Sequence, residues 1–441
     1  MRRAIDNAVV WDGERVIERA SIHMEDDRIV AVATDPGDRF AADERVDADG
    51  RLAIPGLINA HTHLYSSLAR GMSVPGYAPT SFTQILEQLW WRLDKALDDS
   101  SVATSALVGA MEAARCGVTT LIDHHASPNA IPGSLDRVRD AVCRRVGLRA
   151  ALCYETSDRD GAERATLGIR ENARFLASLD PRDHLCCGHF GLHASLTLGD
   201  RTLEAAAAEL PEGAGVHIHV AEGPEDEPAC VKNHGVRIIP RLDRFGFLRP
   251  RSILAHCLHV DAGEKDLIAQ RDAIVVHNPR SNMNNAVGTF DLDGFLDRGV
   301  AAGLGTDGLG ANMLSELFTA GLVQRQARQD ARVGTFPELD RLLFRNNPAI
   351  AERVFGVPVG RLVPGAPADV AVLDYAAPTP LTGDDVLGHL LFGIAVHALR
   401  VSDLYIAGRP VLRNGLFADL DEREEYAHAR EEARRLWKRI V

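Results

Sequence analysis

The chain has 441 residues, of which 46% are hydrophobic and 25% charged, a composition typical of globular proteins with a sizeable core. This length has room for one large catalytic domain and a smaller partner, and wholesale disorder is excluded. The 62 acidic residues outnumber the 49 basic ones and give a formal charge of −13, so nucleic acid is not an expected partner.

Two further features of the sequence concern its location. No apolar run reaches the length of about 18 residues that a membrane-spanning helix needs, so no membrane association is expected. The first residues, MRRAIDNAVVWDGERV, carry charges where a signal peptide needs its apolar stretch. The sequence therefore predicts a cytoplasmic protein.

Both ends of the chain have the pattern of short strands separated by turns. Residues 3–35 contain three such strands with Asp-Gly and Asp-Asp turns, and residues 369–375 and 401–415 resemble them. We expect these segments to form one small β-sandwich domain, built from residues 1–55 and 361–420. The pattern of the remaining residues, 421–441, predicts an amphipathic helix that packs through Leu436, Trp437 and Ile440.

Between these ends, short apolar runs alternate with helical stretches. Eight runs are candidate strands, and they lie at 52–63, 117–125, 148–158, 184–195, 215–222, 252–260, 273–279 and 300–308. The intervening helices are expected near 83–116, 134–146, 161–178, 200–210, 230–245, 261–271 and 291–298. Eight βα units predict a (β/α)8 TIM-like barrel over residues 56–360, an α/β fold whose functional residues lie at the carboxyl ends of the strands.

The first of these strands ends with two histidines. Residues i and i+2 of a strand point to the same side, so His61 and His63 face one spot at the barrel mouth and form a candidate metal chelate. Alone, the pair fits two structural histidines at least as well.

Metal-ligand residue types recur at other strand ends. His219 and Glu222 end the fifth strand, His256 the sixth, His277 the seventh and Asp307 the eighth. Imidazoles with a carboxylate suit zinc or ferrous iron, and a coordination position left to water is typical of a catalytic site.

These stretches resemble the amidohydrolase superfamily, in particular its cyclic deaminase and chlorohydrolase branch. The resemblance rests on PGLINAHTHL (55–64), HVAE (219–222), AHC (255–257), VVHNPRSN (275–282) and GLGTDG (303–308). Within the branch, SLARGM, LWWRLDKAL, DHHASPN, YETSDRDG and HNPRSNMNN look most similar to aminohydrolases associated with selenium metabolism.

The resemblance implies a role for each matching residue. It implies that His61, His63, His219 and Asp307 bind the metal, and that Glu222, His256 and Asp307 are catalytic. A bound metal lowers the pKa of water to about 7, which makes hydroxide available at neutral pH. Asp307 and His256 can take the proton of the water, and Glu222 can pass a proton to a ring nitrogen and then to departing ammonia.

Other polar residues at strand ends have both a functional and a structural interpretation. His193 and Arg280 are expected to contact the substrate, although a solvated loop accounts for Arg280 as well. His217 lies about 7 Å deeper than His219 along the strand, so a packing role is favoured for it. His124 and His125 either line the pocket or cap a helix, and His277 is expected to order its loop.

The expected number of metal ions depends on whether the chain has a lysine that could bridge two of them. Binuclear members of the superfamily commonly bridge two metals with a carbamylated lysine on the fourth strand, but this chain has only Lys95, Lys232, Lys265 and Lys438, all elsewhere. The interpretation is therefore one divalent metal per chain, zinc ahead of iron. Glu155, at the end of the third strand, is the residue that could replace the lysine.

The expected reaction is metal-dependent hydrolytic deamination of an aminated heterocycle, such as a purine, pyrimidine or triazine-like ring. Two alternatives stay open: hydrolysis of a C–Cl or cyclic-amide bond on the same scaffold, and an accessory binding protein in selenium metabolism. The expected partner is this small heterocyclic substrate, together with a second copy of the chain in a homo-oligomer, a dimer being the first expectation.

Overall fold

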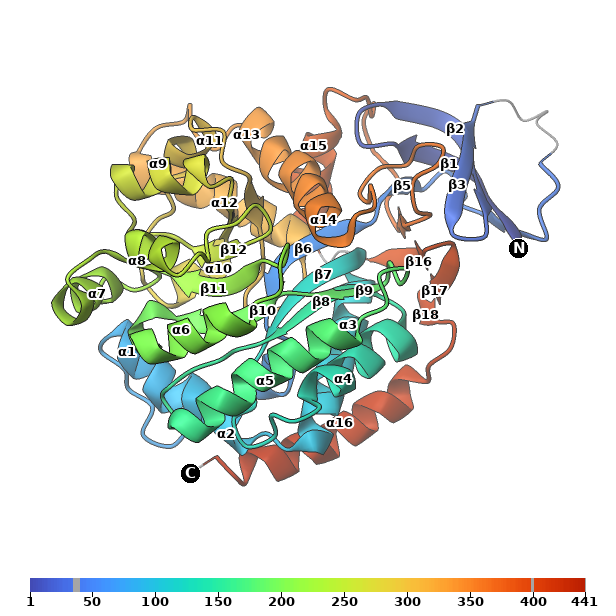
Figure 1. The fold of residues 1–441 in the computed structure, drawn as a ribbon. Helices are drawn as coiled ribbons and strands as arrows, with labels where there is room; N and C mark the ends of the chain where they lie inside the picture. Colours follow the sequence, from blue (N-terminus) through green and yellow to red (C-terminus); the bar gives the residue numbers. More distant parts are fainter. Residues whose placement is uncertain (35–39, 398–399, 441) are drawn as a thin grey trace.

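The computed structural model describes residues 1–34, 40–397 and 400–440, arranged as a large α/β body with a smaller sheet at one side (Figure 1). Parallel strands lie at the centre of the large body and helices surround them (Figure 1).

The smaller sheet combines strands from both ends of the chain. Its nine strands are β1 (Arg2–Trp11), β2 (Val16–Glu25), β3 (Arg28–Ala33), β4 (Glu44–Asp47), β5 (Leu52–Pro55), β15 (Val370–Leu373), β16 (Val401–Ile406), β17 (Arg409–Arg413) and β18 (Leu416–Phe417). The order is β18-β17-β16-β15-β5-β1-β2-β3, with β4 on β1. Antiparallel pairing of β5 with β15 joins the two halves. The expected sandwich is thus one continuous hydrogen-bonded sheet among the described strands.

The central strands form two parallel sheets. The first contains β6 (Leu57–Thr62), β7 (Val118–His125), β8 (Arg149–Tyr154) and β9 (Cys186–Gly188), and the second β10 (Phe190–Ala194), β11 (Val216–Val220), β12 (Ile253–His256), β13 (Ile274–His277) and β14 (Ala302–Leu304). Isolated parallel bridges, Thr62 with Asp307 and Thr156 with Leu192, link the two sheets. Helices cover these strands, which accounts for their nearly continuous apolar sequences.

Two of the eight predicted strands are divided in the structure. The first splits at Gly56 into β5 of the small sheet and β6 of the barrel. A Cβ at this position would lie 2.2 Å from the side chain of Thr119, so the crossing requires glycine. The fourth splits at His189 into β9, which pairs with β8, and β10, which pairs with β11.

Helices connect these strands. They are α1 (Phe82–Ile85), α2 (Trp91–Ala96), α3 (Asp99–Arg115), α4 (Ser134–Arg139), α5 (Ala162–Ser178), α6 (Asp200–Glu209), α7 (Asp226–His234), α8 (Ile238–Arg244), α9 (Ala262–Gln270), α10 (Pro279–Asn284), α11 (Leu292–Leu296), α12 (Met313–Arg328), α13 (Phe336–Asp340), α14 (Asn347–Phe355), α15 (Val386–Gly388) and α16 (Glu422–Trp437). The helix predicted over 83–116 is interrupted because Asp98 caps α3 through the backbone N–H of Ser101. The helix predicted over 230–245 is interrupted at Gly235, which has a φ of 71°.

The carboxyl-terminal helix α16 lies against α3 and the turn at 64–69, and it begins at the N-cap Asp421. Leu436 is fully buried, and the indole N–H of Trp437 donates to the carbonyl oxygen of Leu68 over 2.8 Å. The final residue of the predicted tail, at position 441, lies outside the described residues.

Among the described residues, no helix has both the length and the apolar character required to cross a membrane.

Candidate active site and metal centre

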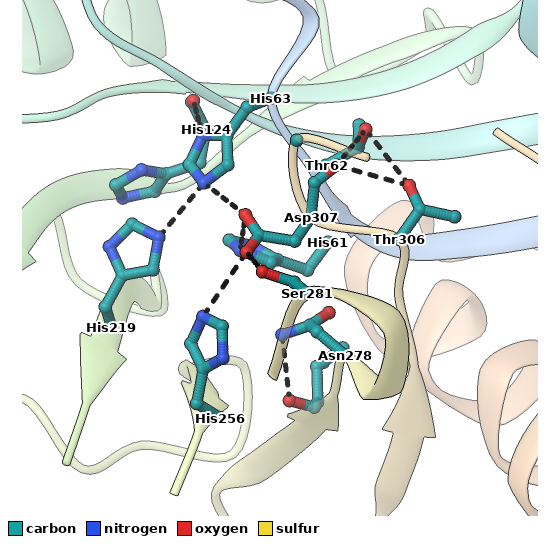
Figure 2. Close-up of polar contacts among 12 residues, drawn as sticks. His61, Thr62, His63, His124, His219, His256, Asn278, Ser281, Thr306 and Asp307 are labelled. Atoms are coloured by element: carbon teal, nitrogen blue, oxygen red, sulfur yellow. Dashed lines mark hydrogen bonds and ion pairs between the residues drawn. The ribbon is translucent and has the colours of Figure 1, made fainter. Parts of the chain in front are cut away.

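Four buried side chains converge where the central strands end. His61 and His63 come from β6 and its end, His219 from β11, and Asp307 from the segment after β14 (Figure 2). One possible ligand atom of each residue lies within 4.8 Å of those of the other three. The Oδ1 atom of Asp307 is 2.9 Å from Nε2 of His63 and 3.6 Å from Nε2 of His61.

The three imidazoles are oriented through their other ring nitrogens. Nδ1 of His63 donates to the carbonyl oxygen of His124 over 2.6 Å, and Nδ1 of His219 donates to that of His193 over 2.9 Å. Nδ1 of His61 lies 2.8 Å from Nε2 of His217. All three rings therefore direct Nε2 toward the centre, the arrangement that supporting hydrogen bonds impose on metal-binding histidines.

The chemistry of these groups fits a divalent cation. In the neutral rings of His63 and His219, Nδ1 carries the proton, so the two Nε2 lone pairs face each other across 3.1 Å. Nε2 of His61 is buried without a hydrogen-bond partner. Without a metal, a proton can lie among these atoms: burial opposes it, but the hydrogen bond to Asp307 raises the pKa of His63 to about 9. A bound cation would take the place of that proton. Ligand atoms around a tetrahedral zinc at about 2.1 Å would be about 3.4 Å apart, close to the separations seen here.

A second group of side chains adjoins the same carboxylate. Nε2 of His256 lies 3.3 Å from Oε2 of Glu222 and 3.9 Å from Oδ2 of Asp307. Nδ1 of His256 donates to Oδ1 of Asn282 over 2.8 Å, which leaves Nε2 as an acceptor. The hydroxyl of Ser281 donates to Oδ2 of Asp307. Glu222, His256 and Asp307 thus form a cluster of adjacent titratable side chains beside the candidate ligands.

The local charges determine which of these carboxyl groups holds a proton. Burial raises the pKa of Glu222 well above its usual range, and the neighbouring carboxylates of Asp307 and Asp226 raise it further. Burial also disfavours ionisation of Asp307, but His61 and His63 outweigh it and hold the pKa of Asp307 well below its usual range. The pKa values of two adjacent carboxyl groups are therefore shifted in opposite directions, as is typical of an acid and a base in one site.

The backbone is strained at three of these strand ends. Ala221, His256, Cys257 and Asp307 have φ values of 45°, 72°, 51° and 53°, in the left-handed region that side chains other than glycine rarely adopt. Such strain is concentrated at functional sites, where the surrounding structure imposes it. Here it directs His256 and Asp307 toward the centre.

A cavity with about 770 Å³ of atom-free space opens onto the candidate ligands. Its apolar wall includes Phe82, Leu86, Trp90, Trp91 and Leu309, and its polar wall includes His193, Glu222 and Asp307. This mixture of apolar and polar walls is typical of small-molecule sites. His193 therefore lies where the sequence placed it, with Nδ1 2.6 Å from the hydroxyl of Thr197.

Arg280, the second predicted substrate contact, lies outside the residues that line this cavity. Its guanidinium is 3.6 Å from the carboxylate of the fully buried Glu316, and 39% of its side chain is exposed. The geometry gives no support to its assignment as a substrate contact, because a residue directed at α12 is turned away from the ligand space.

Glu155 lies beside the ligands, in two further groups of possible metal-binding atoms. Each of these groups shares a histidine, His63 or His219, with the first set. The carboxylate of Glu155 is also 3.3 Å from the guanidinium of Arg159. A permanent cation at this distance opposes a second metal ion.

The remaining histidines occupy supporting positions. His125 contacts the hydroxyl of Ser127 over 2.9 Å, and the ring of His277 stacks on Phe290. The ring of His124 donates through Nε2 to the carbonyl oxygens of Leu192 and His217, each over 3.1 Å. Of these rings, only His124 also falls within a group of possible metal-binding atoms, together with His63 and Glu155.

Some functional contacts were missed from sequence. The packing role predicted for His217 omits its contact with His61, although the shared strand parity of His217 and His219 was a signal for it. Ser281 and Asn282 lie in the recognised motif HNPRSN, but only the structure shows that they hold Asp307 and His256. Arg159, which lies over Trp91 in the cavity wall, belongs to the recognised stretch YETSDRDG, but the sequence did not single it out.

The comparisons with known proteins agree with the family resemblance of the sequence motifs. The profile of the amidohydrolase family matches residues 52–411. The chain is 31% identical over 418 residues to a 5'-deoxyadenosine deaminase from Methanothermobacter thermautotrophicus, which covers 92% of both proteins. It is 30% identical over 431 residues to a 5-methylthioadenosine/S-adenosylhomocysteine deaminase from Haloarcula marismortui, covering 96% of this chain and 95% of the relative. A crystal structure of a zinc-bound adenosine deaminase from Xanthomonas campestris matches with a TM-score of 0.82 and 27% identity, covering 98% of both chains.

Proposed function

Since the chain belongs to the amidohydrolase family, we propose that it is a metal-dependent aminohydrolase that removes the amino group of a heterocycle as ammonia. The relatives named as deaminases of adenosine-type compounds favour an aminopurine, free or with a sugar-like substituent, as the ring. The observation that carries the proposal is that Glu222 and Asp307 both lie close to Nε2 of His256, at 3.3 Å and 3.9 Å, beside four side chains that could hold a metal ion.

We propose that His61, His63, His219 and Asp307 hold one divalent cation, zinc before iron. The shared ligands and the Arg159 cation at the Glu155 position support a single ion. The cation supplies Lewis-acid chemistry when bound, lowering the pKa of water to about 7.

The chain's own groups then move the protons. Asp307 Oδ2 and His256 Nε2 lie 3.9 Å apart beside the candidate ligands, where they can orient the attacking water and accept its proton. Glu222 donates a proton to the ring nitrogen next to the reacting carbon. A C–O bond forms and the C–N bond breaks, and the amino group leaves as ammonia with a proton returned through Glu222 and His256.

The cavity seats the ring. Trp91, Trp90 and Phe82 offer aromatic surfaces that suit a planar heterocycle, and His193 offers a polar edge at the same level as the ligands. These residues position the reacting carbon and exclude bulk water, while the acid and base groups act on one edge of the ring.

The test is a panel of purified heterocycles incubated with the zinc-loaded protein. The panel contains adenine, adenosine, 5'-deoxyadenosine, aminopyrimidines, aminotriazines and chlorotriazines, with ammonia, chloride and ring-opened acid measured separately. Ammonia release from at least one amino heterocycle is expected. Release of chloride or acid alone, or no turnover of any ring by metal-loaded protein, would overturn the proposal.

A further inference from the structure

A second cavity also reaches two of the candidate ligands, His63 and Asp307. It has about 840 Å³ of atom-free space. Its inner end is lined by Asn59, Thr62, His63 and Asp307. His63 and Asp307 therefore face both cavities, and this part of the site can be reached by two routes.

The partition between the two cavities is thin. Ser66, Trp90, Gly308 and Leu309 line both of them. The hydroxyl of Ser66 donates to the carbonyl oxygen of His63 over 2.8 Å and contacts that of Gly308 at 3.3 Å. These contacts hold Ser66 between His63 and Gly308, and Asp307, 12% of whose side chain is exposed, lines both cavities.

The inner end of the second cavity has the polarity that water requires. Figure 2 shows Thr62 and Thr306 on the far side of Asp307 from His219 and His256. The hydroxyl of Thr62 donates to the carbonyl oxygen of Asp307 over 3.2 Å, and Asn59 Nδ2 donates to the hydroxyl of Thr306 over 2.7 Å. These bonds hold the inner end of the cavity in place, and the polar side chains of Asn59, Thr62, His63 and Asp307 that line it suit water.

The outer end of this cavity opens at the surface between α3 and the turn at 64–69. Arg70, 69% of whose side chain is exposed, forms an ion pair with Glu112 there. Between this ion pair and Asp307 the wall contains small side chains, Ala69, Ala113 and Ala311 among them. Phe82, Trp91, His193 and Glu222 line the first cavity and not the second, so the ring of the substrate is assigned to the first cavity.

We propose that this second cavity is a passage that carries water to the site and ammonia away from it while the ring occupies the first cavity. The inference rests on the proposed function, in which each turnover consumes one water and releases one ammonia. A planar ring seated on Trp91 and Trp90 closes the first cavity. The two small reactants share size and hydrogen-bonding chemistry, so one polar passage serves both.

The passage is tested with two variants that fill it from different elements, Ala113→Leu on α3 and Ala311→Leu near the outer end. Ala103→Leu is the control, because Ala103 lies on the same helix but outside this cavity. The first measurement needs no substrate: high-resolution crystal structures of the zinc-loaded wild type and variants. In the wild type and in the control we expect a continuous row of ordered waters from Asp307 to Arg70. In both filled variants we expect this row to be broken.

The second measurement compares single-turnover and steady-state rates on a substrate of the wild type. If the passage serves exchange, kcat falls by about fivefold or more in both filled variants while the single-turnover rate stays within about twofold, since chemistry is intact and release is slowed. The fall should be larger when the leaving group is methylamine. The control should match the wild type, and zinc content should be equal in all four proteins.

Two results would overturn the passage. One is a dry second cavity in the wild-type crystal structure. The other is a kcat in both filled variants equal to that of Ala103→Leu. If the waters are present but no heterocycle releases ammonia, the deaminase proposal fails and the passage stands as a water route to the site, so the two failures are distinguishable.

Discussion

Nδ1 of His61 and Nε2 of His217 lie 2.8 Å apart, and both rings are completely buried. His217 precedes the proposed ligand His219 by two residues on β11, so a single strand would supply one ligand and the support for another. The contact fixes the His61 ring with Nε2 toward Asp307. We therefore propose that His217 positions His61 in the metal centre.

Replacing His217 tests this role. We expect His217→Ala to weaken zinc binding by about 10- to 100-fold, the usual effect of removing a partner that orients a metal ligand. His217→Gln, which can still accept a hydrogen bond, should recover part of the affinity. Competition with a chromophoric chelator measures both. An affinity of His217→Ala equal to that of the wild type would return His217 to a packing role.

Zinc content tests the ligand set itself. Protein purified without added metal should contain about one zinc or iron per chain by elemental analysis, and His63→Ala should contain little. The His63→Ala variant should remain folded by circular dichroism, because a catalytic site contributes less to folding than a structural zinc site does. A reproducible content of two metals per chain would contradict the single-ion proposal.

The Glu222→Gln variant tests whether Glu222 transfers protons or only supports the structure. The amide keeps the shape of the side chain but cannot carry a proton, and loss of general acid catalysis costs about 10²- to 10⁴-fold in kcat. Metal content and melting temperature should stay near the wild-type values. Glu225→Gln, three residues further along, is the matched control and should remain active. Retention of more than about a tenth of kcat by Glu222→Gln would remove this residue from the mechanism.

The two predicted substrate contacts have different positions, and their variants should behave differently. His193 lines the cavity, so His193→Ala should raise KM more than it lowers kcat, as expected for an interaction formed equally in the ground and transition states. Arg280 is directed toward Glu316, so Arg280→Ala should leave KM nearly unchanged. A large increase in KM for Arg280→Ala would show that the substrate extends past the cavity to α12.

Stability should depend on pH through Glu316. Burial raises the pKa of this carboxyl from 4.5 to about 8, although Arg280 opposes the shift. Between these values the folded protein binds a proton that the unfolded chain does not, so the free energy of unfolding falls as pH rises from about 4.5 to about 8. Glu316→Gln removes the titrating group, so its melting temperature relative to the wild type should be higher at pH 9 than at pH 5. Exposed Glu209→Gln is the control, and parallel pH profiles of the wild type and Glu316→Gln would refute the assignment.

Periodicity and strand-end chemistry were enough to predict the α/β class, the parallel central strands and the small sheet built from both ends of the chain. Sequence could not show where a continuous apolar run divides. Gly56 lies inside such a run, and only its 2.2 Å approach to Thr119 explains the change from the small sheet to the barrel. The break before α3 had a readable signal in Asp98, which was overlooked because the surrounding residues suit a helix.

The candidate site likewise has features that the sequence predicted and features that it did not. The histidines and Asp307 lie at strand ends, where parallel strands bring distant residues together, so their convergence followed from the pattern. The direction in which each side chain points did not follow from the sequence pattern. Arg280 and Ser281 are neighbours, yet Ser281 bonds to Asp307 while Arg280 points to α12. Direction depends on the helical turn that α10 begins at Pro279, which no short-range pattern specified.

The pairing of β5 with β15 determines how early the small sheet can be completed while the chain is synthesised. Residues 52–55 emerge from the ribosome more than 300 positions before their antiparallel partners at 370–373. Every strand of the barrel is therefore translated while the apolar β5 still lacks one neighbour, and such unpaired strands are prone to aggregation. The nascent chain thus has a long interval in which chaperone binding at 52–55 would be productive, and its small sheet can be completed only after translation has nearly ended.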